Sequence, residues 1–196
     1  MRKVRLLLWL LVALALLGAG LLLLRQPGSQ SSSVTPVSLG GPFTLTGTDG
    51  RPFPSSRLVG KPYAMFFGFT HCPDVCPTTL ARLVRLRRQL NSGADPFAIV
   101  FVTVDPERDG PKELGRYLSL FGEPVIGLTG TPARIDAVKR QFGIFSQKSP
   151  DGSGGYTVDH SAAVLLFDRN GQFVATISGE ENDAAALAKL KRITSV

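Results

Sequence analysis

The feature that most constrains the fold is a short segment in which an apolar strand leads, through two cysteines, into a helix. Tyr63–Phe69 is a continuous apolar run, typical of a buried strand. Cys72-Pro-Asp-Val-Cys76 follows and holds the only two cysteines among 196 residues. A helix is predicted from Pro77 to about Leu90. Pro77 suits the first helical position, so we expect Cys76 to cap this helix and Cys72 to lie in the preceding turn.

This placement gives the two thiols a predicted chemistry. Both sulfur atoms would lie near the positive end of the helix dipole, which favours the thiolate form. Two thiolates at this spacing can form a disulfide or chelate a soft metal ion. The alternative is that Cys72 and Cys76 form a structural disulfide or are simply two small buried residues.

The elements around this segment predict an α/β domain. The expected elements are a hairpin at 42–50, strands at 98–104 and 125–128, helices at 111–121 and 132–143, a hairpin at 162–178 that turns at Asn170-Gly171, and a helix at 183–192. Residues 147–155 are rich in turn formers, and we expect them to form a mobile loop. The order β-α-β-α-β-β-α predicts a thioredoxin-like fold with an N-terminal β-hairpin extension and one inserted helix.

The N-terminal segment predicts one transmembrane helix before this fold. Nineteen apolar residues, 6–24, come close to spanning a bilayer core of ~30 Å. Basic residues precede them, which predicts a cytoplasmic N-terminus. We therefore expect a membrane anchor at 1–25, a flexible tether at 26–39 and a folded domain at 40–196. The alternative is a signal peptide cleaved near Gly20.

The net charge of +7 does not indicate a nucleic-acid partner. Four of the 22 basic residues flank the apolar run, and the remaining 18 exceed the 15 acidic residues by only three. The predicted helix at 77–90 carries a cluster of arginines, which we expect to form its solvated side: Arg82, Arg85, Arg87 and Arg88.

Several motifs in the same order resemble the Sco (SenC) family of copper-binding assembly factors for cytochrome c oxidase. They are Gly68-Phe-Thr-His-Cys-Pro-Asp-Val-Cys-Pro-Thr-Thr79, Val102-Thr-Val-Asp-Pro-Glu-Arg-Asp109, Leu128-Thr-Gly130 and Tyr156-Thr-Val-Asp-His-Ser161. The resemblance covers about Gly40 to Gly179, together with the single N-terminal anchor.

The resemblance implies a thioredoxin fold and one copper ion bound by Cys72, Cys76 and His160. The ion that we expect is Cu(I), and Cu(II) is the alternative oxidation state. The implied partners are the oxidase subunit that carries the binuclear copper site, a thioredoxin-like reductant and a periplasmic copper donor. The implied location is the bacterial inner membrane, with the folded domain in the periplasm. Two thiolates and one imidazole are also a donor set that suits Cu(I) on chemical grounds.

Four other sites carry weaker signals. His71 adjoins Cys72, but neighbouring residues in a tight turn seldom bind one ion, so we do not expect it to be a ligand. Asp74 is either a residue that tunes the thiols or one that stabilises the turn. Asp105–Asp109 is either a salt-bridged loop that starts the next helix or a docking surface for a partner. Asp159 could orient the imidazole of His160.

Two other functions remain open. The first is a thiol–disulfide oxidoreductase that reduces the cysteines of the oxidase copper site or of other exported proteins. Such enzymes usually have two residues between the cysteines, and the three found here favour chelation. The second is a peroxidase of the peroxiredoxin type, whose reactive cysteine follows a threonine by three positions. Phe69 and Pro73 occupy those positions here, which disfavours it.

Overall fold

A computed structural model describes residues 39–90, 96–152 and 154–195, together with positions 2, 3, 5, 9, 10, 12–14 and 16–18. The chain divides into two units, Met1–Val37 and Ser38–Val196. The described positions between 2 and 18 are helical. Among all described residues, no helix has the length and apolar character needed to cross a membrane. The predicted anchor at 1–25 and tether at 26–39 lie largely outside the described residues and stay predictions.

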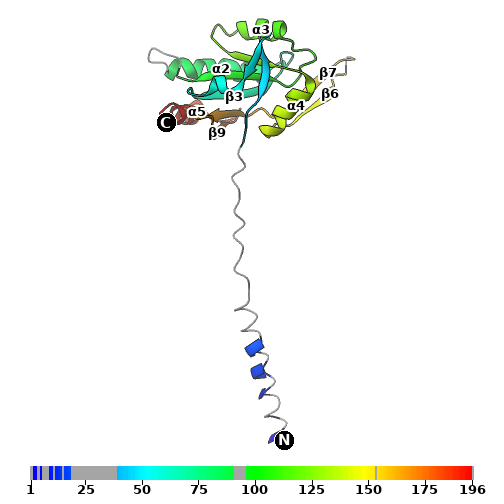
Figure 1. Cartoon of the computed structure of the whole chain (residues 1–196), viewed down its shortest axis with the longest axis vertical. Helices are drawn as coiled ribbons and strands as arrows, with labels where there is room; N and C mark the ends of the chain where they lie inside the picture. The colour runs from blue at the N-terminus through cyan, green and yellow to red at the C-terminus, as the bar shows by residue number, and fades with distance from the viewer. Residues whose placement is uncertain are drawn as a thin grey trace. The chain divides into compact units, whose positions relative to one another are not determined.

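The second unit is built on a seven-stranded sheet with the order β2-β1-β5-β4-β3-β8-β9 (Figure 1). The strands are β1 (Thr44–Gly47), β2 (Pro52–Pro54), β3 (Tyr63–Gly68), β4 (Ala98–Thr103), β5 (Ile126–Thr129), β8 (Val164–Phe167) and β9 (Phe173–Ile177). Strands β3, β4 and β5 are parallel, whereas β8 runs antiparallel to β3 and β1 runs antiparallel to β5. This is the predicted α/β, thioredoxin-like order, and β1–β2 is the predicted N-terminal hairpin.

The two central strands are buried at every position, as their apolar runs predict. Side chains alternate between the two faces of the sheet. On one face the rings of Phe66 and Phe101 pack 6.0 Å apart. On the other face Phe67 packs 5.8 Å from Phe142. The core therefore covers both faces of β3, and the loop that follows this strand is attached to a rigid support.

The predicted helices are confirmed as α2 (Val75–Leu90), α3 (Pro111–Ser119), α4 (Pro132–Gln141) and α5 (Asp183–Thr194); a short 3₁₀ helix, η1 (Ser55–Leu58), was not predicted. Helix α2 begins two residues before Pro77, so the prediction that Cys76 caps it is wrong. Proline is tolerated throughout the first turn, because the N–H groups there have no partner within the helix. Asp74 precedes the helix, and its carbonyl accepts the N–H of Thr78 at 3.1 Å.

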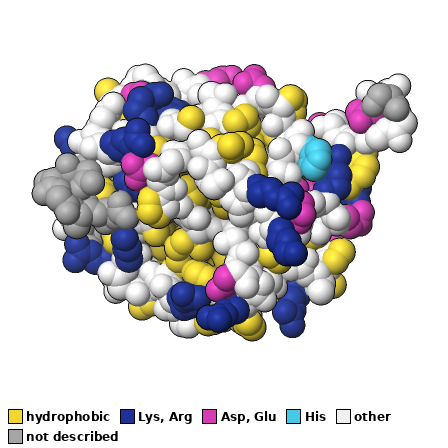
Figure 2. All heavy atoms as spheres, turned by 90° about the horizontal axis from the view of Figure 1, so that it is seen from above, with side chains coloured by type: hydrophobic (Ala, Val, Ile, Leu, Met, Phe, Trp, Pro, Cys, Tyr) yellow, Lys and Arg dark blue, Asp and Glu magenta, His cyan; other side chains and the backbone are white. Residues whose placement is uncertain are grey.

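The arginines of α2 are not all solvated, and the prediction is wrong for Arg87, which is only 2% exposed. Its Nη1 donates to the carbonyl of Pro124 at 2.9 Å and its Nη2 lies 3.3 Å from Glu123. A long apolar stem can pack against the core while the charged head reaches a polar partner. Basic side chains on the face shown in Figure 2 are scattered and interspersed with acidic ones.

The prediction of a mobile loop at 147–155 is wrong for the first half of this range. Residues 146–150 form strand β6 (Ser146–Pro150), which pairs antiparallel with β7 (Tyr156–His160). These strands form a separate two-stranded sheet, and Figure 1 shows them extending away from the main sheet. Strand β6 has no apolar residue in Ser-Gln-Lys-Ser-Pro, so periodicity gives no strand signal there. His160 consequently ends a strand instead of following a loop.

Candidate metal centre

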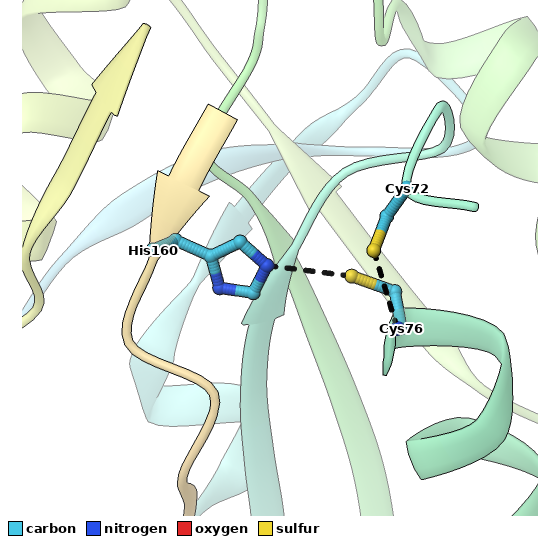
Figure 3. Close-up of side chains that lie close together, drawn as sticks. All are labelled: Cys72, Cys76 and His160. Carbon is cyan, nitrogen blue, oxygen red and sulfur yellow. Dashed lines mark hydrogen bonds between the residues drawn. The ribbon is translucent and has the colours of Figure 1, made fainter. Parts of the chain in front are cut away.

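Three side chains from different elements meet at the carboxyl end of β3 (Figure 3). Cys72 lies in the loop after β3, Cys76 in the first turn of α2, and His160 at the end of β7. Their ligand atoms all lie within 4.8 Å of one another. Two ligands bound to one ion at ~2.2 Å each can be at most ~4.4 Å apart. Small side-chain movements are therefore enough to bring these three atoms around a shared ion.

The hydrogen bonds of His160 identify the ring nitrogen that faces the thiols. Its Nδ1 lies 2.9 Å from the carbonyl oxygen of Ser161, which can only accept a hydrogen bond. Nδ1 must therefore carry the proton, and Nε2 keeps its lone pair. Nε2 lies 3.5 Å from the Sγ of Cys76. The imidazole is thus held as the tautomer that can donate electrons to a metal ion at this point.

Aromatic rings hold this imidazole from the side. The ring of Phe69 lies 5.8 Å from the His160 ring, nearly perpendicular to it, and Phe66 lies 6.2 Å away. Both phenylalanines belong to the apolar run of β3 and the loop after it. The apolar run therefore serves two purposes, since it fills the core and also shields one side of the site.

Helix α2 places both sulfur atoms near its N-terminus, as predicted. The backbone N–H of Cys76 points to the Sγ of Cys72 at 3.4 Å. Cys72 is partly exposed and Cys76 is fully buried, and both are free thiols. The prediction that the helix end favours thiolate is wrong for Cys76, because burial, the largest effect, raises the pKa of its thiol well above the ordinary range. A metal ion that binds Cys76 must therefore displace a proton.

Gly68 leaves the space that Cys76 occupies. A Cβ atom at this position would lie 2.8 Å from the Sγ of Cys76 and 2.9 Å from the ring of Phe101. Both distances are too short for a real contact, so any larger side chain would displace the sulfur atom or the ring. Sequence reasoning did not identify this residue. A glycine at the end of an apolar strand can nevertheless indicate that another group packs closely against the backbone, and this signal could have identified Gly68.

A buried carboxylate supports the loop that carries Cys72. Asp109 is fully buried and accepts hydrogen bonds from the backbone N–H of Thr70 at 2.9 Å and from the hydroxyl of Thr103 at 2.6 Å. Asp105 is also fully buried and forms an ion pair with Arg108. Among the two interpretations of Asp105–Asp109, the structure supports the salt-bridged loop, with Gly110 and Pro111 starting α3.

The remaining candidates lie near the site without joining it. The side chain of His71 is 56% exposed, and its Nδ1 lies 3.0 Å from the hydroxyl of Thr70. Asp74 accepts a hydrogen bond from the hydroxyl of Thr78 at 3.1 Å, which supports its turn role. Asp159 accepts one from Ser149 across the hairpin at 2.7 Å. The proposal that Asp159 orients His160 is therefore wrong, because successive side chains of a strand point to opposite faces.

Comparison with known proteins gives a consistent result. Residues 32–195 match the SCO1/SenC family. Protein SCO2, mitochondrial, of Saccharomyces cerevisiae is 38% identical over 159 residues, which are 79% of this chain and 52% of that protein. The chain thus spans about half the length of this relative.

Two solved structures are also similar. The structure of Bradyrhizobium japonicum ScoI with copper bound has a TM-score of 0.72 and 42% identity, covering 79% of this chain and 99% of that one. A structure of BsSco, described as a member of the Sco family of cytochrome c oxidase assembly proteins with a disulfide switch, has a TM-score of 0.63 and 26% identity, covering 80% of this chain and 93% of that one.

Proposed function

Because the chain belongs to the SCO1/SenC family, we propose that it is a copper metallochaperone and not primarily an enzyme. It binds one copper ion through Cys72, Cys76 and His160 and delivers it to the binuclear copper site of cytochrome c oxidase. The observation that carries this proposal is the grouping of these three ligand atoms within 4.8 Å. The copper-bound structure of the similar ScoI protein supports the choice of metal.

The donor set favours Cu(I) as the cargo. Thiolates are soft ligands that select Cu(I), and imidazole suits copper in both oxidation states. With two thiolates and a neutral imidazole, bound Cu(I) leaves a net charge of −1 at the N-terminus of α2. The positive end of the helix dipole partly offsets that charge. With Cu(II) the same ligands would form a site of zero net charge. Because a neutral site is less costly to bury than a charged one, Cu(II) is the second state that these ligands could hold.

The recipient and the other partners are proposed from the family. The oxidase subunit that carries the binuclear copper site receives the ion, and the description of BsSco as a cytochrome c oxidase assembly protein supports this choice. A periplasmic donor supplies the copper. A thioredoxin-like reductant keeps both thiols reduced, since an oxidising compartment would otherwise convert them to a disulfide.

We place the folded domain in the periplasm, held to the bacterial inner membrane by a single helix at 1–25. Support comes from the apolar run 6–24 and from the basic residues Arg2, Lys3 and Arg5 that precede it. Accessibility of engineered cysteines on either side of the run, tested in whole cells, would check this orientation.

The direct test is to titrate the purified, reduced full-length chain with Cu(I) in competition with a chromophoric chelator. We expect one copper ion per chain, and loss of that binding when Cys72 and Cys76 are both replaced by serine. Binding of copper with unchanged affinity by the doubly substituted chain would contradict the proposal.

A second function is favoured by the unequal exposure of the cysteines. Cys72 is partly exposed while Cys76 is fully buried, as expected for an attacking thiol and a resolving thiol. The Cys72 thiolate would attack a disulfide of the target and release one target thiolate. Cys76 would then displace the second target sulfur. Two electrons would pass to the target, and the chain would end with a Cys72–Cys76 disulfide. The upstream reductant would then reduce this disulfide back to two thiols.

Two measurements on the same preparation separate these functions. A metallochaperone should bind Cu(I) tightly and reduce insulin disulfides slowly. A reductase should do the reverse, and it should keep reducing disulfides under conditions in which no copper is bound.

A further inference from the structure

We propose that Tyr156 is a positioning residue for His160, which it holds against the cysteines through strand β7. This inference rests on the proposed function, in which His160 is a copper ligand. Tyr156 is the first residue of β7 and His160 is the last. The four intervening steps of ~3.3 Å place the two residues ~13 Å apart. Tyr156 is therefore too distant to touch the ion and can act only through the strand.

The hairpin needs such an attachment because its own backbone pairing does not connect it to the main sheet. Strands β6 and β7 pair with each other in a separate two-stranded sheet. Cys72 and Cys76 instead follow β3, which belongs to the seven-stranded sheet. Residues 161–163 join His160 to β8 of the main sheet. The position of His160 relative to the two sulfur atoms therefore depends on this short link at the end of β7 and on side-chain contacts along the strand.

Tyr156 makes polar and cation–π contacts at the first end of β7. Its hydroxyl donates to Oδ1 of Asp105 at 2.9 Å, and Asp105 is fully buried. Nη1 of Arg108 donates to the carbonyl of Tyr156 at 2.9 Å. The guanidinium of Arg108 lies 3.8 Å from the centre of the Tyr156 ring, and the ammonium of Lys148 lies 4.6 Å from it. We call Asp105, Arg108, Lys148 and Tyr156 the tyrosine clamp.

The clamp is connected to the cysteine side of the site. Asp105 lies just beyond the end of β4, whose Thr103 is the register partner of Gly68 in β3. Gly68 in turn packs against Cys76. Arg108 also lies 5.8 Å from the ring of Phe69, which contacts the His160 ring. The clamp thus fixes the hairpin to the same end of the sheet that carries both cysteines.

The alternation of β7 explains why fixing one residue fixes the other. Tyr156, Val158 and His160 share one face of the strand, because the side-chain period of a strand is two. Val158 is buried between them. Loss of the clamp would release the first of these three anchors and allow the strand to rotate or slide, which moves the imidazole away from Cys76.

Arg108 takes part in the clamp although one of its nitrogen atoms lacks a hydrogen-bond acceptor. Its Nη2 is buried, and no group among the described residues accepts a hydrogen bond from it. An unpaired buried donor is costly. The position of the guanidinium is therefore set by its contacts with Tyr156, Asp105 and Phe69 and not by full hydrogen bonding of its own nitrogen atoms.

The test uses two substitutions in the reduced full-length chain. Tyr156→Phe removes only the hydroxyl that binds Asp105, and Tyr156→Leu also removes the aromatic ring from the two cations. Residues that orient a metal ligand typically change affinity by ~10–100-fold. We expect Tyr156→Leu to weaken Cu(I) binding by ~10-fold and Tyr156→Phe to have a smaller effect in the same direction. Tyr63→Phe, at the buried tyrosine that begins β3, is the control and should leave affinity unchanged.

A double-mutant cycle distinguishes positioning from general destabilisation. If Tyr156 acts through His160, its substitution should have no further effect on copper affinity in a His160→Ala background. An equal loss in both backgrounds would overturn the proposal and assign Tyr156 a structural role only.

A measurement on the metal-free protein keeps this test independent of copper. The chain has only two histidines, so acylation of His160 by diethyl pyrocarbonate can be compared with acylation of the exposed His71. We expect Tyr156→Leu to accelerate the reaction at His160 and to leave His71 unchanged. Unchanged reactivity of His160 would overturn the positioning role. Failure of the unsubstituted chain to bind copper would instead contradict the proposed function, and the acylation result would still decide whether Tyr156 positions His160.

Discussion

The Nε2 atom of His160 lies 3.5 Å from the Sγ atom of Cys76, although 84 positions separate the two residues in the sequence. The contact joins a strand of the small hairpin to the first turn of α2. Since the two partners belong to different elements, the site forms only in the folded protein. Each ligand comes from a different element, so each can be replaced without changing the other two.

Loss of a single ligand should affect copper binding according to its place in the site. We expect Cys72→Ser or Cys76→Ser to abolish stable Cu(I) binding, because two-coordinate thiolate ligation is then impossible. His160→Ala should weaken binding by more than ~10-fold, since loss of a residue that only orients a ligand already changes affinity by ~10–100-fold. His71→Ala is the control and should have little effect. Competition titration measures all four, and an unchanged affinity for His160→Ala would contradict the three-ligand site.

Oxidation should control copper loading. A Cys72–Cys76 disulfide leaves neither thiolate free, so the oxidised chain should take up almost no copper, whereas the reduced chain should take up one ion. The measurement is metal content after adding copper to each form and removing the excess. Equal stoichiometric uptake by the two forms would be incompatible with this mechanism.

Gly68→Ala should disturb the site without altering any ligand. The added Cβ would meet the Cys76 sulfur at 2.8 Å and the Phe101 ring at 2.9 Å, and overpacking of this kind typically costs ~1–3 kcal/mol. We expect a lower free energy of unfolding for the reduced, metal-free chain and weaker Cu(I) binding. Gly179→Ala is the matched control, since a Cβ there has nothing within 4 Å. Equal stability of the two variants would show that the Cys76 pocket can expand.

The three tyrosines predict a loss of stability in alkali. Burial, followed by the charge of Asp168, raises the pKa of Tyr63 to about 12. Burial also raises the pKa of Tyr117 and of Tyr156. An unfolded tyrosine has a pKa of about 10, so the unfolded chain loses these protons first. The stability contribution is complete below about pH 10 and falls as the pH rises toward 12.

Two measurements check this prediction over the same pH range. Ultraviolet absorbance follows the ionisation of the tyrosines, and circular dichroism follows unfolding. Tyrosinate absorbance should rise well above pH 10, and Tyr63→Phe should reduce the loss of stability in this range. Half-ionisation of all three tyrosines near pH 10 in the folded chain would refute it.

Copper binding should also slow hydrogen exchange in β7. Coordination of His160 attaches the end of the hairpin to α2, so amides of Tyr156–Ser161 should become more protected in the copper form than in the reduced metal-free form. The buried strand β4 serves as an internal reference and should change little. Identical exchange in β7 would mean that copper does not attach the hairpin.

Most of the sheet could be predicted because its strands carry their own signal. The runs that became β3 and β4 are apolar at nearly every position, and Asn170-Gly171 indicated the hairpin of β8 and β9. Thr131 and Pro132 predicted the start of α4, where the Thr131 hydroxyl accepts the N–H of Arg134. These features are local, so the sequence alone is sufficient to find them.

The errors arose where distant residues decide the structure. Strand β6 has no apolar pattern and exists because it pairs with β7. Arg87 is buried because a carbonyl of the loop at Pro124 accepts its hydrogen bond. The sulfur of Cys76 is buried, and its pKa is raised, by packing that no local spacing reveals. The ligand grouping itself was expected from the family resemblance, since a separation of 84 positions between Cys76 and His160 gives no geometric information.

The separation of the hairpin from the main sheet has a practical consequence for protein engineering. Of the residues between β6 and β7, those that the structure describes (151, 152, 154 and 155) pair with no strand of the main sheet, so a peptide grafted there should leave the core register intact. The interval from Tyr156 to His160 has no such freedom. One inserted residue would turn the imidazole to the opposite face. Reporter sequences and affinity tags therefore belong between β6 and Tyr156, and no residue should be inserted or deleted between Tyr156 and His160.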